Sequence, residues 1–186
     1  MRIISGIFKG KKILEPLDIK TRPLKDLTKE SIFNILKHSN KFRVNLEGAI
    51  VLDLFSGVGS FGIECLSRKA KKVFFIENYK NVLPVLKKNL LNLKLINNFE
   101  IIEKDIYNDD VFNFLNYKFD IIFLDPPYKD KHLEKILIKI KNSKILKKEG
   151  ILILHRHKKE KEIFSSNFNI IEEKKYGISK IYFIYF

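Results

Sequence analysis

Short apolar runs alternate with segments of helical spacing over most of this chain. Strands that are apolar nearly throughout and alternate with helices are typical of a parallel sheet that is covered on both faces. Pro84 lies inside the second helical pattern and predicts a late start or a bend of that helix. The predicted strands are 49–55, 73–77, 100–102 leading to Asp105, 119–125 and 151–154, and the predicted helices are 60–69, 79–95 and 131–146.

The two ends of the chain follow other patterns. Residues 3–8 and 13–14 indicate short strands around a turn. Thr28 is a candidate cap for a helix that ends near residue 38. Two β runs close the chain, 168–175 and 179–186, and the turn between them predicts a hairpin on the edge of the sheet.

The length of 186 residues suits one domain, and 45% hydrophobic with 31% charged residues argues against disorder. No apolar stretch approaches the roughly 18–20 residues of a membrane span, so we expect no membrane partner. The N-terminus lacks the apolar run of a signal peptide. The single cysteine, Cys65, excludes an intrachain disulfide and a cysteine-based zinc site, which fits a reducing cytoplasm. Nothing indicates an obligate interface, so we expect a monomer.

The net charge of +14 invites a nucleic-acid partner, because a basic surface attracts phosphates and releases counterions. However, 31 of the 36 basic residues are lysine, and isoleucine and asparagine are also abundant. These residues have A/T-rich codons, so a biased genome also explains the composition. Charge alone therefore leaves both explanations open.

A glycine loop follows the first predicted strand. The segment from Asp53 to Gly62 contains G-x-G-x-x-G between that strand and the next helix. Glycines let the backbone turn tightly and approach a ligand at the carboxyl edge of the sheet. The spacing alone is shared by several nucleotide-binding families, and a plain strand-to-helix turn is the alternative.

Acidic residues at the ends of the strands narrow the choice of ligand. Glu77 closes the second strand, where a carboxylate accepts hydrogen bonds from ribose hydroxyls. Asp53 would repel a pyrophosphate but attract a sulfonium group, which favours S-adenosylmethionine over a nicotinamide cofactor. Asp105, after the third strand, is placed to accept from an adenine amino group, with a cap or loop carboxylate as the alternative.

The strongest motif is Asp125-Pro126-Pro127-Tyr128, at the end of the fourth strand. The two prolines make a stiff loop that displays carbonyl oxygens. The Asp125 carboxylate and the Pro126 carbonyl would accept hydrogen bonds from one planar amine, while Tyr128 stacks on the ring that bears it. Catalysis would rest on orientation and preorganised electrostatics, without a metal. An amine inside a duplex would first have to be flipped out.

With these residues in place, the chain resembles the RsmD family, which methylates a guanine N2 amine of small-subunit ribosomal RNA. The resemblance spans nearly the whole chain. Its motifs are Arg2-Ile3-Ile4-Ser5-Gly6 with Lys9-Gly10-Lys11-Lys12, then Arg22-Pro23, Asp26 and Glu30 to Leu36, the loop Asp53–Glu64, Asp125–Tyr128 and Tyr176-Gly177.

Four positions depart from the family pattern. Leu27 and Lys29 stand where two arginines are usual, Val58 replaces Ser or Thr, and His155 stands where an acidic residue is usual. We interpret the stretch from His155 to Lys161 as a solvated or RNA-facing loop.

The resemblance implies a Rossmann-like, S-adenosylmethionine-dependent methyltransferase sheet, mostly parallel with an antiparallel last strand. We expect a basic N-terminal β extension over 1–27 and the catalytic domain over 28–186. The substrate implied is ribosomal RNA in a small-subunit particle. The residues expected to bind the cofactor are Asp53, Phe55, Ser56, Gly57, Gly59, Glu77, Asn78, Asp105 and Ile106, and those expected to touch RNA are Arg2, Lys9, Lys11, Lys12, Arg22 and Lys25.

Other functions stay open at this point. A DNA adenine N6 methyltransferase could use the same Asp-Pro-Pro-Tyr chemistry, but few residues lie outside the sheet to read a DNA sequence. A catalytically silent RNA-binding module would be expected to have lost Asp125 or the glycines, and the chain has both. A nicotinamide oxidoreductase is disfavoured, because no hydride-transfer acid or base accompanies the loop.

Overall fold

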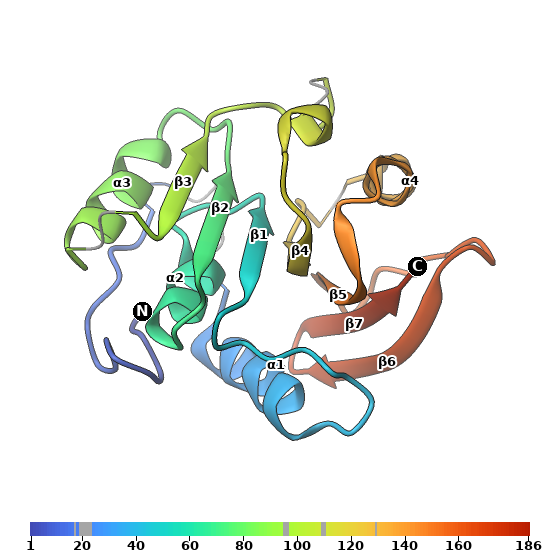
Figure 1. Ribbon diagram of the computed structural model, residues 1–186, viewed down its shortest axis with the longest axis horizontal. Helices are drawn as coiled ribbons and strands as arrows, with labels where there is room; N and C mark the ends of the chain where they lie inside the picture. Colours follow the sequence, from blue (N-terminus) through green and yellow to red (C-terminus); the bar gives the residue numbers. More distant parts are fainter. Residues whose placement is uncertain (17, 19–23, 95–96, 109–110, 129) are drawn as a thin grey trace.

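The computed structural model describes residues 1–16, 18, 24–94, 97–108, 111–128 and 130–186. Within them, seven strands form one sheet in the order β3-β2-β1-β4-β5-β7-β6 (Figure 1). The strands are β1 Ile50–Leu54, β2 Lys72–Ile76, β3 Phe99–Ile102, β4 Phe119–Leu124, β5 Leu146–His157, β6 Asn169–Tyr176 and β7 Ser179–Tyr185. The helices are α1 Asp26–His38, α2 Ser60–Ser67, α3 Leu83–Leu91 and α4 Leu133–Ser143, with a 3-10 turn at Val111–Phe114.

The pairing of the strands confirms the predicted fold class. Strands β1 to β5 pair in parallel, and β7 lies antiparallel between β5 and β6. The terminal hairpin therefore sits at one edge of the sheet, as the two closing β runs predict. Because parallel strands share a direction, the loops after β1, β2, β3 and β4 all leave the sheet at its carboxyl edge.

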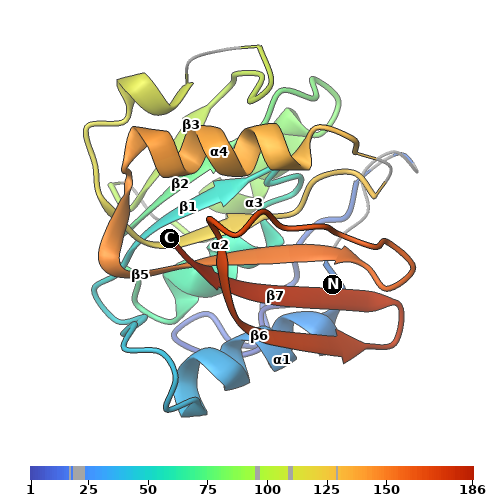
Figure 2. The same ribbon diagram turned by 90° about the vertical axis from the view of Figure 1, so that its right-hand side faces the viewer.

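Successive residues of each central strand enter two different cores. Val51 and Val73 face the core shared with α1, α2 and α3, whereas Leu52 and Phe74 face the core beneath α4. Figure 2 shows α4 over one face of the sheet and α1 and α2 over the other. This double burial explains why the strands are apolar nearly throughout.

The N-terminal segment differs from the expected pair of strands. Its described residues form one isolated bridge, between Arg2 and Lys12. Its backbone also bonds to side chains of the helices. The Glu64 carboxylate accepts from the N–H groups of Ile4 at 2.8 Å and Ser5 at 2.9 Å, and Asn89 of α3 pairs with the backbone of Leu14. Ile3 and Ile13 join the core, so the segment is fastened to the catalytic sheet. The division at residue 27 stays a prediction.

Two element boundaries also differ from the predictions. Helix α1 begins at Asp26, so Thr28 lies inside it and is not its cap; its hydroxyl donates to Ser179 Oγ at 3.2 Å. Strand β5 continues through His157, so the expected loop at His155 is part of the sheet. Helix α3 starts late, with Pro84 in its first turn, as predicted. No helix in the described part of the chain is long and apolar enough to cross a membrane.

The buried Glu64 gives a prediction about stability. It accepts two backbone N–H groups and Arg68 Nε, at 2.8 Å, and is itself fully buried. Glu64→Ala leaves these donors without their acceptor, and we expect the free energy of unfolding to fall by about 3–5 kcal/mol. Urea denaturation measures the loss, and proteolysis should cut residues 1–8 first.

Glu103→Ala is the matched control, because Glu103 pairs with Lys87 at the half-exposed surface and such pairs contribute roughly 0–1 kcal/mol. An equal loss in both variants would contradict the anchoring role of Glu64.

Candidate active site

Acidic side chains meet at the carboxyl edge of four neighbouring strands. Asp53 lies near the end of β1, Glu77 and Asp125 directly follow β2 and β4, and Asp105 comes three residues after β3. The strand order β3-β2-β1-β4 brings all four to one edge, as the sequence predicts. This edge is the place where open α/β sheets bind ligands.

The glycine loop joins β1 to α2 with unusual backbone angles. Phe55, Gly57 and Gly59 all have positive φ, at 58°, 55° and 84°. A Cβ on Gly62 would lie 2.3 Å from the Phe75 ring, so Gly62 allows close packing of α2 on β2. The loop therefore combines the tight turn of a nucleotide site with close helix-on-sheet packing.

Asp53 is held inside this turn. Its side chain is 1% exposed, and Oδ2 accepts from the Gly62 N–H at 2.9 Å. Burial raises the pKa of Asp53 well above its usual range; the hydrogen bond opposes this, and the charges of Asp125 and Glu77 add to it. The site thus concentrates negative charge that a cationic group would relieve, which fits a sulfonium ligand.

Glu77 ties the loop to the end of β2. Its Oε2 accepts from the Gly57 N–H at 2.8 Å, and its Oε1 accepts from the N–H groups of Asn78 and Tyr79 at 2.9 and 2.8 Å. Each carboxylate oxygen offers about two acceptor positions, so Oε2 keeps one beyond its bond to Gly57, and contact with a ribose hydroxyl stays a prediction. Ser56 bonds through both its N–H and its hydroxyl to the Ile76 carbonyl, which fixes the loop against β2.

Asp105 lies beside this loop in a turn of its own. Its carboxylate accepts from the Tyr107 N–H at 2.9 Å and from Asn108 at 3.0 Å. Ile106 is buried, and the Tyr107 ring lies 5.6 Å from that of Phe55, whereas the Asn78 side chain is exposed. The cap-like bonding shows that Asp105 shapes this turn, and contact with adenine stays a prediction.

The Asp-Pro-Pro-Tyr loop is braced from β5. Arg156 is 1% exposed and donates to the carbonyls of Pro127 at 2.9 Å and Tyr128 at 3.0 Å. It also pairs with Glu162. Pro126 is buried and Pro127 exposed, while Tyr128 is partly exposed. The guanidinium therefore fixes the path of the loop just after Asp125 and Pro126.

His155 contacts Asp125 directly, which the sequence did not reveal. Its Nδ1 lies 2.8 Å from Asp125 Oδ1, and its ring is 4% exposed. The interpretation of this stretch as a solvated loop is wrong at His155 and Arg156, because β5 buries both. The departure of His155 from the family pattern, directly after an apolar strand, is the signal that could have found it.

The residues expected to touch RNA lie in and directly after the N-terminal segment. The described ones have exposed side chains, and Arg22 lies outside the described residues. Lys11 lies over the Phe8 ring at 4.9 Å. The described ones are Arg2, Lys9, Lys11, Lys12 and Lys25. Their exposure fits contact with phosphates, which stays a prediction.

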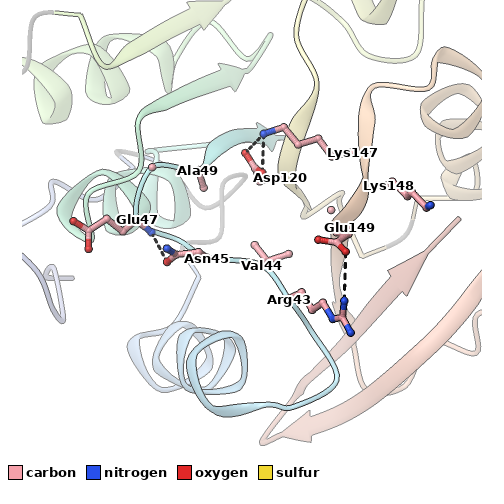
Figure 3. A pocket seen from close by; sticks show the side chains of 11 residues that line it. Arg43, Val44, Asn45, Glu47, Ala49, Asp120, Lys147, Lys148 and Glu149 are labelled. Carbon is pink, nitrogen blue, oxygen red and sulfur yellow. Dashed lines mark hydrogen bonds and ion pairs between the residues drawn. The ribbon is translucent and has the colours of Figure 1, made fainter.

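A separate cavity of about 440 Å³ lies at the opposite, amino edge of the sheet (Figure 3). Four of its charged side chains form two ion pairs, Lys147 with Asp120 at 2.8 Å and Arg43 with Glu149 at 3.7 Å. It contains none of the predicted site residues. Among the described residues, no group of three or more His, Cys, Asp or Glu side chains is arranged to hold a metal ion.

The sequence of the chain matches a known protein family. A family profile described as "Conserved hypothetical protein 95" matches residues 1–185. The chain belongs to this family. It is the RsmD family, which the motifs resemble, so that expectation is confirmed.

Relatives and a solved structure match nearly the whole chain. "Ribosomal RNA small subunit methyltransferase D" of Haemophilus influenzae is 33% identical, covering 96% of this chain and 90% of that protein. "Putative rRNA methyltransferase YlbH" of Bacillus subtilis is 31% identical, covering 97% and 96%. The putative methyltransferase YhhF of Escherichia coli superposes with a TM-score of 0.78 at 27% identity, covering 99% of this chain and 96% of that one.

The chain is therefore a methyltransferase by family and fold. A more distant methyltransferase, solved in complex with SAH, has the same fold at 16% identity and a TM-score of 0.63, covering 85% of this chain and 49% of that one.

The buried Asp53 of this RsmD-family protein gives a prediction about pH. A free aspartate has a pKa of about 3.9, and the folded-state pKa of Asp53 lies above it. Folding is therefore favoured by protonated Asp53, and stability is lost as the pH rises from the unfolded to the folded pKa. Asp53→Asn keeps an acceptor for Gly62 without the charge, so we expect it to be more stable by about 1–2 kcal/mol near pH 7.

Urea unfolding near pH 4 and near pH 7 measures this, and the gain should grow with pH. Asp120→Asn is the control, since Asp120 is paired with Lys147 and accepts from the Ile50 N–H, and there we expect a loss. A less stable Asp53→Asn variant near pH 7 would contradict the conclusion that the buried charge of Asp53 destabilises the folded protein.

Proposed function

We propose that this protein transfers a methyl group from S-adenosylmethionine to the exocyclic N2 amine of a guanine in small-subunit ribosomal RNA. The observation that carries the proposal is the position of Asp125, held by His155 at the same sheet edge as the glycine loop and Glu77. The relatives named as ribosomal RNA small subunit methyltransferases support the substrate class.

The residues at the edge of β1 and β2 fit this cofactor. Glu77 Oε2 would accept from a ribose hydroxyl, and the charges of Asp53 and Glu77 suit a cation. Asp105 would accept from the adenine amine, with Phe55 and Ile106 as the apolar surface beside it. When bound, the cofactor supplies a methyl carbon that leaves its sulfonium sulfur, the C–S electron pair staying on sulfur as the amine lone pair forms the C–N bond.

The residues after β4 act on the amine. A guanine amine is conjugated with its ring, so its nitrogen is a poor nucleophile. Asp125 Oδ2 and the Pro126 carbonyl would each accept a hydrogen bond from the amine. These two bonds would localise the lone pair on nitrogen. Tyr128, whose backbone is held by Arg156, would stack on the base. The contribution of the protein is orientation and preorganised charge.

Recognition of the RNA would involve residues outside the sheet edge. A paired guanine must leave its helix to reach Asp125. The exposed basic side chains Lys9, Lys11, Lys12 and Lys25 would contact phosphates around that site. As the sequence leads us to expect, the protein would act as a monomer in the cytoplasm, on a small-subunit particle.

Mass mapping of ribosomal RNA from a strain that lacks the gene tests the substrate. We expect one N2-methylguanine of the small-subunit RNA to be lost and to return when the wild-type gene is restored. An intact ribosomal pattern together with the loss of N6-methyladenine from DNA would favour the DNA adenine methyltransferase instead.

Replacement of Asp125 tests the mechanism. In Asp125→Ala, we expect turnover to fall by about a hundredfold or more, because an acceptor for the amine is gone. Calorimetry should still show binding of S-adenosylmethionine and its demethylated product, and no binding of NAD. Glu103→Ala, at the half-exposed surface, serves as the control with normal turnover. Normal turnover of Asp125→Ala would refute the role of the carboxylate.

A further inference from the structure

His155 bonds on both sides of its ring, inside the protein. Nδ1 lies 2.8 Å from Asp125 Oδ1, and Nε2 lies 2.9 Å from Ser179 Oγ. Ser179 in turn accepts from the Thr28 hydroxyl at 3.2 Å, and both hydroxyl residues are buried. A continuous chain of hydrogen bonds therefore runs from α1, through β7 and β5, to the carboxylate after β4.

These bonds can be satisfied by a neutral imidazole. Because Thr28 donates to Ser179 Oγ, the Ser179 hydroxyl hydrogen remains for His155 Nε2. Nε2 is then the acceptor, and Nδ1 carries the hydrogen that is donated to Asp125 Oδ1. A protonated ring would need Ser179 to turn its hydrogen away from Nε2.

Charges around the ring act against one another. Burial lowers the pKa of His155, and the attraction of Asp125 and its hydrogen bond raise it more; Arg156, the next residue on β5, lowers it. The partners from β7 and α1, Ser179 and Thr28, are uncharged, and Tyr128 presents its ring at 6.0 Å. The net effect raises the pKa of His155 above its usual value, so the ring takes up a proton more readily than a free imidazole.

We propose that His155 is a positioning residue for methyl transfer: its Nδ1–H holds Asp125 Oδ1, which leaves Oδ2 for the substrate amine, and its charge state controls how strongly that carboxylate accepts. The proposal rests on the proposed function of Asp125. With a neutral ring, Asp125 keeps its full negative charge. With a charged ring, the positive charge of His155 beside Oδ1 offsets the negative charge of the Asp125 carboxylate.

The proton released by the reaction would also go to Asp125. The amine nitrogen carries a positive charge once its lone pair has bonded to the methyl carbon, and it must lose one hydrogen as a proton. Asp125 Oδ2 would receive it and pass it to water, because the Asp125 side chain is 18% exposed. A positive imidazolium behind Asp125 would oppose this transfer, so turnover should fall at acidic pH as His155 becomes charged.

The pH dependence of turnover separates this role from a structural one. In His155→Asn, the amide nitrogen takes the place of Nδ1 and does not titrate. We expect its turnover at high pH to stay within about threefold of wild type and the fall toward acidic pH caused by the imidazole to disappear. In His155→Ala we expect turnover to be about tenfold lower throughout, because Asp125 loses its donor. His38→Asn, an exposed histidine at the end of α1, should keep the wild-type profile.

An unchanged acidic fall in His155→Asn, or wild-type turnover in His155→Ala, would overturn the proposal. Thermal unfolding and calorimetry with S-adenosylmethionine establish that each variant is folded and binds the cofactor.

An NMR titration of the histidine rings tests the pairing without any turnover. In Asp125→Asn the pKa of His155 should fall, since the attracting charge of Asp125 is gone. An unchanged His155 titration would overturn the proposal. If the wild type methylates no ribosomal particle, the proposed function fails, whereas this titration still decides whether the pair exists.

Discussion

Backbone N–H groups that donate to buried carboxylates hold the functional edge of this protein together. Asp53 accepts from Gly62, Glu77 accepts from Gly57, and Glu64 accepts from Ile4 and Ser5. The first bond joins β1 to α2 across the glycine loop, the second ties the glycine loop to the end of β2, and the last two tie the N-terminal segment to α2. A charged acceptor makes a stronger hydrogen bond than a neutral one, and a buried one must be satisfied. These bonds hold the glycine loop against β1, β2 and α2 in the structure.

Two buried cations bind backbone carbonyl groups, as the carboxylates bind N–H groups. Arg156 gathers the carbonyls of Pro127 and Tyr128, and Lys29 is fully buried with Nζ 2.9 Å from the Arg2 carbonyl. Part of the high positive charge is thus structural, and it lies inside the protein. The lysines of the N-terminal segment are exposed instead, so the net charge of +14 combines two different roles.

His155 shows how a departure from a family pattern acquires a meaning in three dimensions. A histidine at this place gives Asp125 a hydrogen-bond donor that an ionised carboxylate could not provide. The Ser179 hydroxyl that orients the ring comes from the far end of the chain, 24 residues later, and is itself fixed by Thr28. The four residues have no common motif, and only the antiparallel pairing of β7 with β5 brings Ser179 beside His155.

The sequence by itself determined the alternation of strands and helices, the carboxyl-edge positions of Asp53, Glu77 and Asp125, and the family. These features are local: apolar runs, glycine spacing and a four-residue motif carry them within short windows. The sequence did not determine that the N-terminal segment would bond to helix side chains, that β5 would extend to His157, or that His155 and Arg156 would brace the Asp-Pro-Pro-Tyr loop. Those outcomes depend on partners far apart in the chain. The burial of a polar side chain is stabilised only by a partner that the folded chain supplies, so the tertiary structure alone decides it.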